Sequence, residues 1–262
     1  SITLRAMEND FLCLEGGTYL HTSRGLLRLN ELVERTSIGT DTRTDEVGVL
    51  THTGAVERIT HGHFIGPREA YRIRTRAGFT LVGGGAHPVL RLNQDFSLEW
   101  VEVKKLQKGD YIASIAGAHV WPRVPADISS FDPGATAHEI RSDLPPIHIP
   151  GELTPDLARL LGYLVSEGSC NGDNSMSLSN SDREVLEDAT RILSEQFGYA
   201  SPLRLKTRAK GSFKTVRPHW EVAIGRRPLV RFLHWLGVKG LSYEKEVPWC
   251  VRMSGERIVA SF

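Results

Sequence analysis

The sequence of 262 residues predicts an all-β domain followed by an α+β unit. From residue 13 to about residue 116, short runs of β-forming residues alternate with turn residues, many of them glycines. After residue 150 the apolar residues recur every three or four positions, which is typical of amphipathic helices. Residues 119–150 contain six prolines and little periodicity, so we expect a linker between the two regions.

Each expected strand of the first region is a β-forming run bounded by turn residues. We expect strands at 18–20, 26–29, 47–53, 57–65, 70–75, 79–82, 89–92, 100–103 and 111–113. In the second region Thr154-Pro155 forms a helix-start pair, a capping residue followed by proline. We expect helices there at 154–165, 181–197 and 228–236, and strands at 203–207 and 220–224. Helices and strands in succession indicate an α+β unit.

Composition limits the class of protein. A hydrophobic fraction of 40% and a charged fraction of 24% are those of a globular chain. No apolar run reaches the roughly 18 residues of a membrane span, and no segment resembles a signal peptide. We therefore expect a cytoplasmic protein with no membrane partner. The three cysteines are odd in number and widely spaced, which argues against a disulfide framework and favours a nucleophile for any special cysteine.

The net charge of +1 conceals a basic segment at residues 203–231. It holds nine Lys and Arg residues and one acid, Glu221. Within 203–210 the cations occupy alternate positions, so they share one face of a strand, and a solvated face with no ligand usually mixes the two signs. We therefore expect double-stranded DNA to bind here. The DNA-binding candidates are Arg204, Lys206, Arg208, Lys210, Lys214 and Arg217.

Cys13 and His87 are the candidates for covalent chemistry. A cysteine thiol can attack the carbonyl carbon of the preceding residue, provided that the leaving amide nitrogen is protonated and the oxyanion is stabilised. Histidine suits the proton transfer, because its unperturbed pKa is about 6.5. Each residue also has a plainer interpretation, a buried cysteine at the start of a strand and a histidine in a glycine-rich turn.

Three segments together resemble the family of inteins. Residues 13–25 are similar to the N-terminal intein block, Gly-Ala-His-Pro-Val-Leu at 85–90 to the second block, and 100–112 to the strand and turn that follow. The resemblance implies a Hedgehog/intein horseshoe fold over 13–118 that splices without a cofactor. It also implies that the scissile bond joins Leu12 to Cys13, with residues 1–12 as an N-extein or added residues. Gly84 departs from the family, which usually has threonine there.

Residues 160–168 resemble the nine-residue LAGLIDADG signature of homing endonucleases. Gly162 and Ser166 lie four positions apart on one helical face, where small residues allow two such helices to pack closely. The resemblance implies that Glu167 supplies one of two carboxylates that hold Mg²⁺ for phosphodiester hydrolysis once a second repeat completes the site. The alternative is an apolar core helix that ends in Glu-Gly. The unit at 151–262 would then be the first LAGLIDADG-type half domain, with an apolar face around Leu157, Leu161 and Val165 awaiting a partner.

Two expected parts are absent from the sequence, a second signature and a His-Asn pair. The resemblance therefore implies a C-terminal intein fragment that carries both, together with a host extein protein. The chain would be the N-terminal piece of a split intein or a shortened intein, and sequence leaves both open. A competing hypothesis is a homodimeric DNA endonuclease or DNA-binding protein whose β-domain is a passenger. A third, Hedgehog-like autoprocessing, leaves residues after 151 unexplained.

Overall fold

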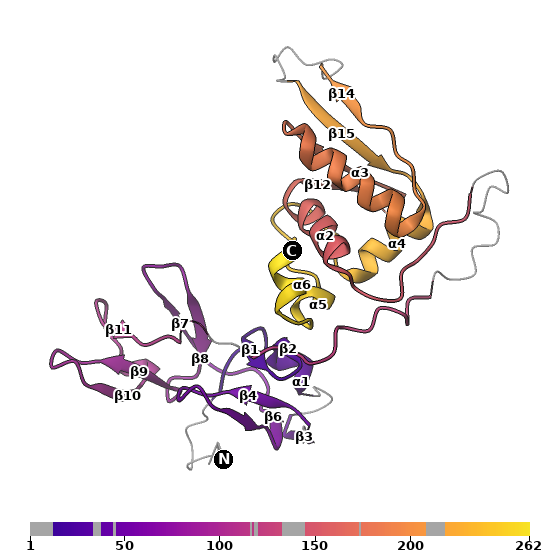
Figure 1. Cartoon of the computed structure of the whole chain (residues 1–262). Coiled ribbons are helices and arrows are strands. Elements are labelled where there is room, and N and C mark those ends of the chain that lie inside the picture. Colours follow the sequence, from indigo (N-terminus) through magenta and orange to yellow (C-terminus); the bar gives the residue numbers. More distant parts are fainter. Residues whose placement is uncertain are drawn as a thin grey trace. The chain divides into compact units, whose positions relative to one another are not determined.

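A computed structural model describes residues 13–33, 38–43, 46–115, 117, 120–132, 145–172, 174–207 and 218–262. The chain divides into two compact units, Ser1–Pro122 and Arg123–Phe262 (Figure 1). Among the described residues, no helix is both long and apolar enough to cross a membrane.

The first unit is rich in β-strands, all paired antiparallel. They form a four-stranded sheet of order β2-β1-β4-β5, a three-stranded sheet of order β10-β9-β11, and the pairs β3-β6 and β7-β8. The elements are β1 (Tyr19–Thr22), β2 (Gly25–Arg28), α1 (Leu29–Leu32), β3 (Thr40–Arg43), β4 (Gly48–Leu50), β5 (Val56–Arg58), β6 (His61–Phe64), β7 (Tyr71–Arg74), β8 (Thr80–Gly83), β9 (Pro88–Leu92), β10 (Leu98–Glu102), the 3-10 helix η1 (Val103–Lys105) and β11 (Tyr111–Ile112).

Most expected strands of this unit are present, with one clear correction. The single strand expected at 57–65 is two strands, because β5 pairs with β4 while β6 pairs with β3 in another sheet. The chain changes sheets around Ile59, whose amide still donates to the Val47 carbonyl at 2.8 Å. Periodicity cannot reveal such a change, since both strands continue the same β-forming run.

The second unit packs three helices on one face of a four-stranded antiparallel sheet of order β12-β13-β15-β14. Its elements are α2 (Pro155–Glu167), β12 (Gly168–Asn171), β13 (Ser175–Asn180), α3 (Arg183–Phe197), β14 (Arg204–Lys206), β15 (His219–Ile224), α4 (Arg227–Leu236), α5 (Trp249–Arg252) and α6 (Glu256–Ser261). The sequence analysis missed β12 and β13, because their serines and asparagines are weak strand formers.

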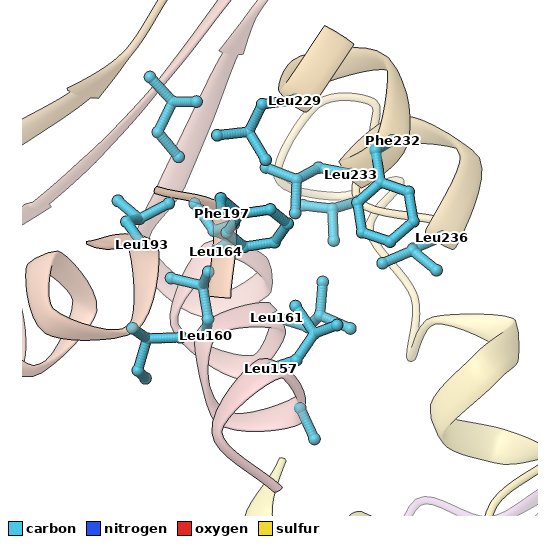
Figure 2. Packing of buried hydrophobic residues seen from close by; sticks show 14 of the residues in the cluster. Leu157, Leu160, Leu161, Leu164, Leu193, Phe197, Leu229, Phe232, Leu233 and Leu236 are labelled. Carbon is cyan, nitrogen blue, oxygen red and sulfur yellow. The ribbon is translucent and has the colours of Figure 1, made fainter. Parts of the chain in front are cut away.

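The core of this unit lies between α2, α3, α4 and the sheet. Figure 2 shows leucines from all three helices converging around Phe197 and Phe232. Met176, Leu178 and Val222 enter the same core from the inner face of the sheet. Helix α2 begins where its sequence predicts, because the Thr154 hydroxyl caps it by accepting a hydrogen bond from the Leu157 amide at 3.1 Å.

Ion pairs join α2 to α3 at the surface. Arg159 bonds Asp188 at 2.7 Å and Asp156 at 2.8 Å, and Arg191 bonds the same two carboxylates at 2.7 and 3.1 Å. The bond from Arg191 holds the pKa of Asp156 below its usual value. Two arginines and two aspartates therefore form a closed network, which we call the α2-α3 ion network.

The expected linker is partly wrong. Residues 123–132 and 145–150 belong to the second unit, and a third part, 133–144, lies outside the described residues. Five apolar side chains of the described parts pack in or against the core: Ala126, Ile128, Phe131, Ile147 and Ile149. Ile128 is fully buried. The Phe131 and Phe232 rings pack edge to face, with 5.2 Å between their centroids. Prolines restrict the backbone but do not prevent an irregular segment from burying its apolar residues.

The expected apolar surface on the signature helix is also wrong. Leu157 and Leu161 are completely buried in the unit's own core, and Val165 packs against it. The chain's own α6 packs on α2, and the backbone of Phe262, which follows α6, comes close to Gly162. A Cβ atom at Gly162 would lie 2.2 Å from the Phe262 carbonyl oxygen. This small residue therefore makes room for a segment of the same chain.

Gly162→Ala should loosen α6 from α2. Alanine favours a helix over glycine by about 1 kcal/mol, but the clash with a backbone oxygen should cost more, about 1–3 kcal/mol. Hydrogen exchange measured by mass spectrometry should show lower protection in α6. Ser166→Ala is the control, because the Ser166 hydroxyl bonds only its own helix in the described structure, to the Gly162 carbonyl at 3.0 Å and the Tyr163 carbonyl. Unchanged protection of α6 in Gly162→Ala would contradict the contact.

Candidate functional site

In the first unit, Cys13 lies beside the end of β8. The Leu14 backbone bridges Gly83, and the Glu15 amide donates to the Val82 carbonyl at 2.9 Å. The Cys13 carbonyl accepts a bond from the Gly84 amide at 3.0 Å. These bonds fix the cysteine backbone against the start of the glycine-rich turn.

That turn carries His87. The His87 amide donates to the Gly84 carbonyl at 3.0 Å, and the His87 carbonyl accepts from the Val103 amide at 2.9 Å. Both candidate residues lie close to Gly83: a Cβ atom there would lie 2.9 Å from the Cys13 carbonyl oxygen and 3.5 Å from the His87 Cβ atom. Cys13 and His87 are distant in sequence but are neighbours around this glycine.

Burial governs the protonation of the His87 ring. Its Nδ1 atom is buried and has no hydrogen-bond partner among the described residues. Burial lowers the pKa of His87 from its usual value of 6.5, so the ring is neutral at pH 7. A neutral imidazole with one unengaged nitrogen can accept a proton from a thiol and return it to another atom.

The remaining residues predicted for this site have simpler positions. Leu12 lies outside the described residues, so the bond between it and Cys13 is not part of the described structure. Cys13 is half-buried with a free thiol. Gly84 has no side chain to offer, and its backbone amide is the group that contacts Cys13.

In the second unit, the outer face of the sheet is polar. Successive side chains of a strand point to opposite faces of the sheet. Because Met176, Leu178 and Val222 point into the core, their neighbours in sequence lie on the opposite face. We call this the outer face, and its residues are Ser169, Asn171, Ser175, Ser177, Ser179, Arg204, Lys206, His219, Glu221 and Ala223. Most of them are small or carry a short hydroxyl or amide group.

Arg204 and Lys206 are the DNA-binding candidates that the structure describes. Both lie on the outer face of β14, the edge strand, opposite Glu221 and His219 of β15. The Lys206 Nζ atom contacts a Glu221 carboxylate oxygen at 3.0 Å. The other four candidates lie outside the described residues: Arg208, Lys210, Lys214 and Arg217.

Glu167 is the last residue of α2 and is exposed, and β12 begins at the next residue. The Lys245 ammonium donates to the Leu164 carbonyl at 3.0 Å and to the Gly168 carbonyl. A cation at a helix C-terminus offsets the negative end of the helix dipole. The sequence analysis missed Lys245, because a lone lysine between two glutamates has no periodicity or motif to mark it.

A metal centre would need more carboxylates than Glu167 supplies. Carboxylate oxygens are ligands that Mg²⁺ prefers, and Glu167 can offer one such group. The described residues contain no group of three or more His, Cys, Asp or Glu side chains that could hold a metal ion.

Comparison with known proteins identifies part of the second unit. Residues 154–237 match the family model of the LAGLIDADG-like domain, a span that runs from the N-cap of α2 to the end of α4 and contains the whole sheet. LAGLIDADG domains belong to homing endonucleases and related DNA-binding proteins, and they act as dimers or paired halves. No curated protein matches the chain.

The low pKa of His87 should make the first unit less stable in mild acid. In the unfolded chain His87 titrates near 6.5, whereas in the folded protein it titrates lower. As pH falls below about 6.5, the unfolded state binds the proton first, and stability is lost until the folded pKa is passed. Hydrogen exchange in β8 and β9 should therefore quicken between pH 7 and pH 5, after correction for the intrinsic rate.

The variant His87→Gln should show a smaller change over the same interval. His148→Gln, in the other unit, is the control and should behave like the wild type in β8 and β9. Equal pH responses in the wild type and His87→Gln would contradict the assignment.

Proposed function

We propose that this chain is the N-terminal part of an intein that also carries half of a homing endonuclease. The observation that carries the first half of the proposal is the contact between Cys13 and the Gly84–His87 turn. The family match at 154–237 supports the second half. A Hedgehog/intein horseshoe fold for 13–118 is part of the same proposal, and the β-rich first unit is compatible with it.

The reaction at Cys13 needs no cofactor. Neutral His87 accepts the thiol proton, and the Cys13 sulfur attacks the carbonyl carbon of Leu12. A C–S bond forms and the C–N bond breaks as His87 returns the proton to the departing nitrogen, which leaves a thioester and a free amine. The residues before Cys13, the N-extein or added residues, remain attached through sulfur.

The chain depends on a partner to complete splicing. We propose a C-terminal intein fragment that supplies the His-Asn block and the second LAGLIDADG repeat, with a host extein protein joined to the pair. The second repeat adds the carboxylate that Glu167 lacks. Glu167 and that second carboxylate would hold Mg²⁺, which would supply positive charge for phosphodiester hydrolysis.

The outer face of the sheet is the proposed surface for duplex DNA. Its small polar side chains allow close approach to a groove, and Arg204 and Lys206 at the edge strand suit phosphates. Glu167 is the last residue of α2, and β12, an edge strand of this sheet, begins at the next residue, so the carboxylate lies at one end of that strand. Lys245 fixes the helix end that carries it.

The second candidate is a homodimeric endonuclease or DNA-binding protein, which the family match at 154–237 supports equally. Two copies of the chain, like the two repeats of the first proposal, would pair through their signature helices, so in either case α6 would have to move away from α2 at Gly162. Size-exclusion chromatography distinguishes the two, since the homodimer predicts a species of twice the chain mass. DNA cutting by such a dimer would favour the alternative.

A strong thiol or hydroxylamine should release residues 1–12 from the purified chain, because the thioester at Cys13 is cleavable. Cys13→Ala should abolish the release, and His87→Ala should slow it roughly 10²–10⁴-fold. Mass spectrometry of the released peptide measures both. Gly84→Thr should speed release, if the usual family residue aids the step. Release from the Cys13→Ala variant would overturn the assignment.

Affinity for duplex DNA should fall steeply with salt, because binding rests on phosphate contacts. Replacing Arg204 with alanine should weaken binding and flatten the slope of log affinity against log salt by about one. Arg183→Ala, on helix α3, is the control for loss of a positive charge. Filter binding across a salt series measures all three proteins. Affinity that is independent of salt would contradict a phosphate-binding surface.

A further inference from the structure

One acidic side chain interrupts the outer face of the sheet. Among the described residues of its four strands, Glu221 is the only acid on that face, which otherwise carries neutral groups and the cations of β14. The role of Glu221 considered below rests on the proposed binding of DNA to this face. DNA phosphates repel a carboxylate that faces them, so DNA binding here requires another interaction of Glu221 that offsets this repulsion.

The register of the strands places Glu221 between two neighbours. Ser179 of β13 lies opposite it on one side and Arg204 of β14 on the other. Its side chain is 22% exposed and its carboxylate contacts the Lys206 ammonium at 3.0 Å. The next residue, Val222, is fully buried on the inner face, which fixes Glu221 on the outer face.

The ion pair with Lys206 by itself contributes little to stability. Pairs with this much exposure are worth about 0–1 kcal/mol, and the Lys206 side chain is 42% exposed. In the free protein the pair does affect DNA binding, because the Glu221 carboxylate neutralises the Lys206 ammonium, which could otherwise bind a phosphate. When Lys206 turns to a phosphate, the carboxylate of Glu221 loses this partner and needs a hydrogen-bond donor.

Base edges offer such a donor. An ionised carboxylate can only accept hydrogen bonds, and cytosine presents its N4 amino group as a donor in the major groove. Adenine also has an amino group there, but its adjacent N7 is an acceptor that repels a carboxylate. Glutamate has a longer side chain than serine, so Glu221 can reach further from the sheet than Ser177 and Ser179 once Lys206 has left it.

We propose that Glu221 is a specificity-determining residue that selects cytosine at one position of the bound DNA. In the free protein it engages Lys206 and thereby weakens binding to arbitrary sequences. On the selected sequence Lys206 moves to a phosphate and Glu221 accepts a hydrogen bond from the cytosine amino group. The same carboxylate thus lowers the affinity for wrong sequences and favours the right one.

The test is selection from a library of random duplexes by the whole chain, followed by sequencing. The wild type should enrich cytosine at one position by roughly fivefold or more over other bases. Glu221→Gln should lose that preference and shift it toward adenine, because an amide pairs with adenine N6 and N7. On unselected duplex Glu221→Gln should bind more tightly and steepen the salt slope by about one, since Lys206 is released.

Two further variants make the result specific. Glu187→Gln is the matched control, since Glu187 pairs with Arg183 at 2.8 Å on α3, and it should leave the base preference unchanged. Glu221→Asp keeps the charge but shortens the side chain, so it should weaken the cytosine preference while unselected binding stays low. It also provides a test if Glu221→Gln fails to fold.

The outcomes separate this inference from the proposed function. Salt-dependent binding by the wild type with the same base preference in Glu221→Gln and Glu221→Asp overturns the role of Glu221 and leaves DNA binding intact. Absence of any DNA binding by the folded wild type overturns the proposed surface and this inference with it.

Discussion

The second unit depends on the burial of one face of helix α2. Leu157, Leu160, Leu161 and Leu164 are all completely buried, and each such side chain contributes roughly 1.5–3 kcal/mol. Because these leucines fix the rotation of the helix, Gly162 faces α6 and Glu167 comes to the end that meets β12. The position of the carboxylate is therefore a consequence of hydrophobic packing, and Lys245 refines it by binding the last carbonyls of the helix.

In the first unit, contacts between backbone groups hold the candidate residue Cys13 in place. Cys13 is positioned by an amide and a carbonyl, and a glycine without a side chain makes room for that approach. A side chain at Gly83 would therefore displace Cys13, because its Cβ atom would lie 2.9 Å from the Cys13 carbonyl oxygen. Its chemistry also depends on burial, since a buried imidazole is neutral and leaves one nitrogen without a partner among the described residues.

Sequence patterns were informative where one local rule decided the outcome. Thr154-Pro155 marked the start of α2, and the apolar spacing of α3 and α4 matched their buried faces. Sequence patterns failed where the structure of a segment depends on residues that are distant in the chain. The switch between sheets at Ile59, the burial of Ile128 in a proline-rich segment and the packing of Phe262 on Gly162 all depend on which surfaces meet. Cys13 and His87 were found as residue types in motifs, whereas Lys245 had no local signal.

The α2-α3 ion network has a consequence for how the second unit responds to its solvent. Its two arginines each bind two carboxylates, but their side chains are 34% and 41% exposed, so salt screens these pairs, and the packing of the helices on the sheet rests on the buried apolar core, which salt does not screen. Arg204 on the opposite layer is exposed. A change in ionic strength therefore acts unevenly across the thickness of the unit: it changes the attraction that we propose between the sheet and DNA, while the helical layer behind the sheet keeps its shape. Salt can therefore control the proposed binding and release of DNA without unfolding the domain.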